Sequence, residues 1–180
     1  MKKLGILFLA VLLSVMAVSV FAETAEVQVI NWETDMLPQL GDQIELGDFY
    51  DYEVFNMKMW VPKFLTQLEV TEDEAKMGYV DKFASEDGKR ALAVYAADIG
   101  KDVENYYKDL LEDPDVANVK LAEVHGLHAI LYQKVSLDWQ IFSFTAGGSK
   151  VVELYFLPAS DEEYAPFMQI TASSVQKLGE

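Results

Sequence analysis

The segment Ala117–Leu157 reads ANVKLAEVHGLHAILYQKVSLDWQIFSFTAGGSKVVELYFL, and it determines the class of fold. β-branched and aromatic residues fill it, and short turn signals interrupt it at regular intervals, which is typical of consecutive antiparallel strands. It predicts strands at 117–124, 127–135, 138–145 and 149–157. Gly126-Leu127 fits a two-residue turn with glycine first, the type II′ pattern, and Gly147-Gly148 fits the same role between the last two strands.

Further strands are predicted upstream, at 54–61, 77–84 and 89–96. The first runs into Pro62, which cannot donate to a sheet and so ends the strand. Asp87-Gly88 is a hairpin signal between the other two. Residues 62–76 are expected to form a connection, and 27–32 is a candidate short strand.

Two main helices are predicted. In residues 102–112 the apolar side chains recur at the spacing of one helical face, and Asp102 is a suitable N-cap. The closing helix is expected to begin near Pro166, because proline inside a helix removes a backbone donor. The fold class is therefore α+β: an antiparallel sheet of about six or seven strands with two main helices packed on it.

The first 22 residues have the layout of a secretory signal peptide. Lys2 and Lys3 precede an apolar run, and Val20-Phe21-Ala22 places small residues at the −3 and −1 positions of a cleavage site. The remaining residues, 23–180, are the right length for a single domain, in which 23–51 forms an N-terminal extension without a clear assignment. We therefore expect a soluble protein that is secreted or periplasmic.

Composition excludes several classes of function. The formal net charge of −16 would repel nucleic acids and anionic membranes, so neither is expected as a partner. The absence of cysteine excludes disulfides, thiolate catalysis, cysteine-ligated metals and a lipoprotein anchor. The sequence contains neither a Gly-x-Ser-x-Gly elbow nor a glycine-rich phosphate loop, so neither an enzyme nor a resident cofactor is expected.

Several of these features together resemble the PsbP-like α/β/α sandwich, in the branch of small secreted bacterial proteins of unknown function. They are the strand that enters Pro62, the Asp87-Gly88 hairpin, the tyrosine-containing helix 102–112, the Gly126 turn, and the run 158–164 that leads into 170–175. The likeness covers about residues 52–178. Because members of that fold are mostly non-catalytic, the resemblance implies a binding or accessory role.

Glu123, His125 and His128 form one candidate site, for a metal ion. If Gly126-Leu127 is the two-residue turn, His125 and His128 lie opposite each other across the hairpin, and Glu123 lies on the same face. Two imidazoles and a carboxylate can hold zinc or another first-row ion. The simpler explanation is that polar residues gather at hairpin ends because these ends are exposed to water.

Tyr50, Tyr52 and Trp60 form a second candidate site, for a sugar or a peptide. Their spacing places them on one face if residues 50–60 continue as one strand, and exposed aromatic rings there would offer a binding platform. The competing explanation is packing under a helix, which is favoured because most large aromatic side chains are buried.

The function that the sequence supports is therefore a secreted, non-catalytic binding or accessory domain, which we expect to be a monomer. Its ligand is an unidentified protein or small molecule outside the cytoplasm. A metal-binding protein and a carbohydrate- or peptide-binding protein are the alternatives.

Overall fold

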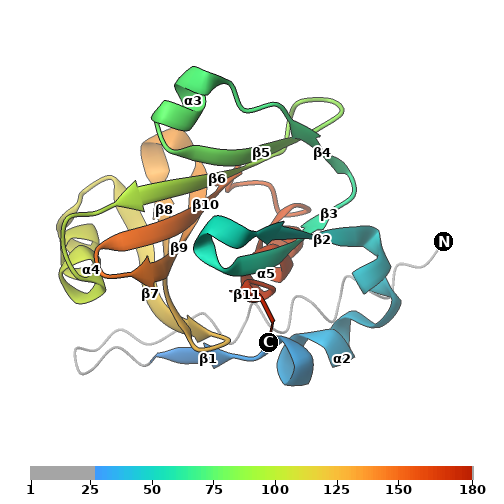
Figure 1. Ribbon diagram of the computed structural model, residues 1–180, viewed down its shortest axis with the longest axis horizontal. Coiled ribbons are helices and arrows are strands. Elements are labelled where there is room, and N and C mark those ends of the chain that lie inside the picture. The colour runs from blue at the N-terminus through green and yellow to red at the C-terminus, as the bar shows by residue number, and fades with distance from the viewer. Residues whose placement is uncertain (1–26, 180) are drawn as a thin grey trace.

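The computed structural model describes residues 27–179 and has a mixed α+β architecture built on two sheets (Figure 1). The main sheet has eight strands, in the order β1 (Gln28–Ile30), β7 (Val116–Val124), β8 (Leu127–Lys134), β9 (Trp139–Gly147), β10 (Lys150–Leu157), β6 (Ala91–Asp98), β5 (Tyr79–Ser85) and β4 (Leu65–Leu68). All neighbours in it are antiparallel except β1 and β7, which are parallel. The small sheet has the order β11 (Gln176–Lys177), β3 (Met57–Pro62) and β2 (Gly47–Tyr52).

Four α-helices connect or cover these strands within the described residues: α2 (Leu37–Leu40), α3 (Glu72–Lys76), α4 (Val103–Glu112) and α5 (Ala165–Ser173). A π-helical turn, Trp32–Met36, leads into α2, and short 3₁₀ turns occupy Gly41–Leu46, Glu53–Phe55 and Val135–Leu137. Asp102 caps α4 as predicted, because its Oδ1 accepts a hydrogen bond of 2.8 Å from the amide of Asn105. The predicted start of the closing helix near Pro166 is also confirmed.

The main sheet lies between two different layers. Alternate residues of a strand point to opposite faces, so each central strand contributes to both. On one face, α4 covers a cluster formed by Leu110, Ile130, Tyr132 and Ile141. On the other, the small sheet and α5 cover a larger core that includes Met57, Met59, Phe142, Phe144, Met168 and Ala172. The α+β class is as expected, but one of the two outer layers combines a small sheet with a helix.

The number of strands is larger than predicted. Residues 62–76, expected to be a connection, contain β4 and α3, and Thr71 with Glu74 closes a capping box at the start of α3. The predicted strand 54–61 starts only at Met57, because Glu53–Phe55 forms a turn and Asn56 has a left-handed φ of 53°. Residues 47–52 then run back beside Met57–Pro62 as β2.

The turn between β7 and β8 also differs from the prediction. Val124 is paired with Leu127, so the two central residues are His125 and Gly126. Both have positive φ, 49° and 70°, which is the type I′ pattern and not type II′. This shift by one residue changes which side chains lie opposite each other across the hairpin.

The packing of Gly47 against Trp60 leads to a test of the fold. A Cβ atom at Gly47 would lie 2.0 Å from Cε2 of the Trp60 indole, and the ring cannot retreat freely because its Nε1 donates to the carbonyl of Ile44 at 2.9 Å. We expect Gly47→Ala to lower the free energy of unfolding by at least about 2 kcal/mol, measured by urea denaturation. Gly88→Ala is the control: it meets nothing within 4 Å and bears only the cost of its positive φ, about 1 kcal/mol. A Gly47→Ala protein as stable as Gly88→Ala would contradict this packing.

Candidate functional site

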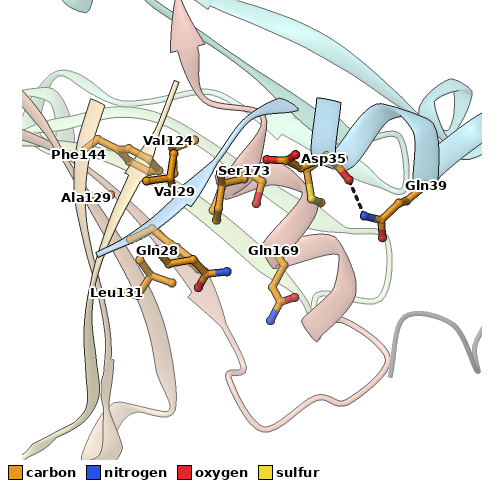
Figure 2. A pocket seen from close by; sticks show the side chains of 14 residues that line it. Gln28, Val29, Asp35, Gln39, Val124, Ala129, Leu131, Phe144, Gln169 and Ser173 are labelled. Atoms are coloured by element: carbon orange, nitrogen blue, oxygen red, sulfur yellow. Dashed lines mark hydrogen bonds between the residues drawn. The ribbon is translucent and has the colours of Figure 1, made fainter. Parts of the chain in front are cut away.

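A cavity of about 200 Å³ lies where β1 and α5 approach the same face of the main sheet (Figure 2). Three separate parts of the chain form its walls: the N-terminal segment, strands β7 to β9, and α5. The lining residues are Gln28, Val29, Ile30, Asp35, Met36, Gln39, Val124, Ala129, Leu131, Phe142, Phe144, Gln169, Ala172 and Ser173.

The lining combines an apolar interior with polar groups near the surface. Val124, Ala129 and Phe144 are buried members of the main core, and they form the floor on the sheet. Gln28 and Gln169 lie nearer the surface, and Figure 2 shows the side chain of Gln28 extending from β1 toward α5, which carries Gln169. Apolar walls with a few polar groups are the usual composition of a small-molecule site.

Small side chains leave this space open. Ala129 of β8 and Ala172 of α5 line the cavity where the helix faces the sheet, and Ser173 lines it beside them. A methyl or hydroxymethyl group at these positions does not span the distance between the two layers, so the volume remains between them.

The N-terminal wall is held in place at the β7–β8 turn. The amide of Trp32 donates to Nε2 of His125 at 2.7 Å, and the amide of His125 donates to the carbonyl of Ile30 at 3.2 Å. The Trp32 side chain is buried with Leu40, Trp60 and Ile170. These contacts fix β1 beside β7, and thereby close one side of the cavity.

His125→Asn tests this attachment. Asparagine tolerates positive φ, and Asn-Gly is a favoured type I′ pair, so the hairpin should be retained. The shorter side chain cannot reach the amide of Trp32, so we expect hydrogen exchange of that amide to accelerate at least about tenfold. Exchange would be followed by NMR, with amides of β8 and β9 in the sheet interior as an internal reference. Unchanged exchange at Trp32 would show that His125 does not hold the segment.

The predicted metal geometry at Glu123, His125 and His128 is wrong. Because the turn is His125-Gly126, the residue opposite His128 is Glu123, and His125 belongs to the turn itself. Its imidazole is directed to the amide of Trp32. Within residues 27–179, no group of three histidine, aspartate or glutamate side chains is placed to hold a metal ion.

The predicted aromatic platform does not form either. Tyr50 is paired with Met59 and Phe49 is paired with Trp60, so Tyr50 and Trp60 lie on opposite faces of the small sheet. Trp60 is 1% exposed, and Tyr50 makes an edge-to-face contact with Phe83 in the core. The hydroxyl of Tyr52 donates to Oδ2 of the buried Asp81 at 3.1 Å. All three aromatics serve packing, as the competing explanation holds.

A cluster of buried polar side chains lies under α4, around the carboxylate of Glu153. Glu153 is 3% exposed. Its Oε1 accepts hydrogen bonds from the hydroxyls of Tyr106 (3.0 Å) and Tyr132 (3.2 Å), and its Oε2 accepts one from Tyr155 (2.5 Å). Burial raises the pKa of each of these three tyrosines, and the negative charge of Glu153 raises it further. The three phenols therefore compensate for the burial of the carboxylate and connect α4 to the sheet.

The raised pKa values predict a loss of stability at alkaline pH. In the unfolded chain a tyrosine ionises near its ordinary pKa of 10.0, whereas in the folded state these three keep their protons to higher pH. The contribution of these raised pKa values to the free energy of unfolding is complete below about pH 10. Above that pH the free energy of unfolding declines by about 1.4 kcal/mol per pH unit for each tyrosine. Tyr132→Phe should remove one such contribution and give a shallower decline in urea unfolding between about pH 9 and pH 11. Equal slopes in the two proteins would contradict the assignment.

Comparison with known proteins gives a match in structure only. No model of a known protein family matches the chain, and no curated protein does. The solution structure of cyanobacterial PsbP (CyanoP) from Synechocystis sp. PCC 6803 is similar, with a TM-score of 0.51 and 14% identity over 73% of this chain and 92% of that protein. The chain has a PsbP-like fold.

A crystal structure from Bacteroides thetaiotaomicron VPI-5482 gives a TM-score of 0.47 with 14% identity, covering 75% of this chain and 50% of that one. The similarity to CyanoP confirms, at the level of the fold, the expectation of a PsbP-like α/β arrangement that was drawn from the strand ends and hairpins. Among residues 27–179, none of the helices has the length and hydrophobicity of a transmembrane span. The signal-peptide prediction, residues 1–22, lies outside the described residues.

The cavity could not be predicted from the sequence because its walls come from segments that are far apart in the chain. The sequence predicts a candidate strand at residues 27–32, but nothing in this segment specifies parallel pairing with β7. The local signal is a set of small residues: Ala129 in the strand segment LHAIL, and Ala172 and Ser173 in the run Thr171–Ser174.

Proposed function

We propose that this protein is a secreted, non-catalytic binding domain that takes a small, mainly apolar molecule into the cavity between β1, α5 and the main sheet. The observation that carries the proposal is the lining itself, in which apolar side chains form the interior and amide groups stand at the surface. The predicted signal peptide supports secretion, and the PsbP-like fold is compatible with a binding role.

The size of the cavity sets the size of the ligand. Small-molecule sites commonly measure about 300–1,000 Å³, and an apolar cavity of about 150 Å³ is enough to hold benzene. At about 200 Å³, this cavity suits a group of roughly six carbon atoms. The ligand is therefore a small molecule or the apolar end of a larger one.

The chemistry of the lining supports binding without turnover. Ser173 is the only hydroxyl among the lining residues, and neither histidine nor lysine lines the cavity to activate it. The one carboxylate among the lining residues, Asp35, accepts hydrogen bonds from the amide of Asn31 and the hydroxyl of Thr34 and is not paired with Ser173, so the arrangement favours orienting a ligand over activating a nucleophile.

Titration with 1-hexanol tests the proposal. Burial of a six-carbon chain at about 0.8 kcal/mol per methylene corresponds to a dissociation constant on the order of 1 mM, measurable by isothermal titration calorimetry. Ala129→Leu places three more carbon atoms in the cavity, and we expect it to weaken hexanol binding at least about tenfold. Its thermal unfolding is recorded in parallel to confirm that the variant is folded.

Ala75→Leu is the matched control, because Ala75 is exposed on α3 and does not line the cavity. We expect it to bind hexanol like the unaltered protein. The absence of hexanol binding, or equal binding by Ala129→Leu, would exclude the cavity as the ligand site.

A further inference from the structure

The cavity carries a charge of one sign only. Of its 14 lining residues, Asp35 is the one with a formal charge, and no lysine, arginine or histidine lines it. The whole chain is also strongly acidic, with a formal net charge of −16. An anionic head group at this mouth would find no counter-charge among the lining residues and would be repelled by the surrounding field.

The Asp35 carboxylate is fixed in position but retains capacity to accept hydrogen bonds. Its Oδ2 accepts from the amide of Asn31 at 2.8 Å, and its Oδ1 accepts from the hydroxyl of Thr34 at 3.0 Å. Each carboxylate oxygen can accept about two hydrogen bonds, so one acceptor position remains on each. Asp35 is exposed, so a ligand group can reach it from the mouth.

Side-chain amides supply further acceptors at the same mouth. Within the described part of the chain, the side-chain amides of Gln28 and Gln169 make no hydrogen bond, whereas Gln39 donates through Nε2 to the carbonyl of Asp35 at 2.5 Å. The side-chain carbonyl oxygens of Gln28 and Gln169 can accept hydrogen bonds from a ligand head group that carries several donors. A primary ammonium carries three N–H donors and a positive charge, and so matches both the amides and Asp35.

We propose that the cavity is selective for primary aliphatic amines, with the alkyl chain on the apolar floor and the ammonium group beside Asp35. This inference rests on the proposed function, and it adds the chemical class of the ligand. The principal rival is an alkyl carboxylate held by Lys120, which is paired with Leu131 in the β7–β8 register but does not itself line the cavity.

Three ligands that share a six-carbon chain and differ in the head group test this selectivity: hexylamine, 1-hexanol and hexanoate. The affinity of each is measured by calorimetric titration at neutral pH and low ionic strength. We expect hexylamine to bind at least about tenfold more tightly than hexanoate, with hexanol between them, because the Asp35 charge acts at short range and is weakly screened. Asp35→Asn should reduce the ratio of hexylamine to hexanol affinity toward one.

Gln169→Lys provides a second test, which leaves the Asp35 carboxylate in place. It places a cation at the mouth on α5, and we expect it to reverse the order so that hexanoate binds more tightly than hexylamine. Gln43→Lys is the matched control: it makes the same change in net charge at an exposed position outside the lining, and it should keep the original order.

The outcomes separate the two proposals. Equal affinity for hexylamine and hexanoate would overturn the selectivity while leaving the cavity as a binding site. Tighter binding of hexanoate that is lost in Lys120→Gln would overturn it in favour of an anion site. Failure of all three ligands, hexanol included, would overturn the proposed function itself.

Discussion

The positive φ values at His125 and Gly126 are the constraint on which the arrangement of the binding region depends. They make the β7–β8 connection a two-residue type I′ turn, which pairs Val124 with Leu127 and fixes the register of the hairpin. In that register the imidazole of His125 accepts a hydrogen bond from the amide of Trp32. The N-terminal segment is thereby held against the end of the sheet, and β1 becomes one wall of the cavity. A register shifted by one residue would have exchanged the faces of the hairpin.

Local signals in the sequence account for most of the elements. The 3.6-residue period of 103–111 and the cap at Asp102 predict α4, and the alternating runs 77–84 and 89–96 predict β5 and β6. These predictions succeed because the relevant interactions join residues that are close in the chain. The same reasoning fails at residues 53–56, where the 3₁₀ turn Glu53–Phe55 and the left-handed Asn56 reverse the chain and create the β2–β3 hairpin. The aromatic residues on either side of this reversal then fall on different faces, so a rule based on one continuous strand places Trp60 wrongly.

The candidate site was much less predictable than the fold. The expected metal site lies on one hairpin, so its geometry depends on which two residues form the turn. A shift of the turn by one residue changes which side chains face each other. The cavity depends instead on the meeting of residues near positions 30, 130 and 170, and composition gives no direct information about such contacts. The polar groups at its mouth, Gln28 and Gln169, are ordinary surface residues in the sequence. They become a pair only because β1 and α5 lie on the same face of the sheet (Figure 2).

The two faces of the main sheet show why the cavity occurs on one side only. Under α4, large side chains fill the space, and the one buried carboxylate there, Glu153, has a phenol donor for each of the hydrogen bonds described. Removing one of these three donors would leave the buried carboxylate with one hydrogen bond fewer, which lowers the stability of the fold. Under α5, alanine at 129 and 172 and serine at 173 meet across the interface, and no larger neighbour fills the volume between them. The interior there is apolar and its polar groups stand at the mouth, so a ligand can displace solvent without breaking buried hydrogen bonds. One sheet therefore combines a face packed around a buried hydrogen-bond network with a face whose small residues leave room for a ligand.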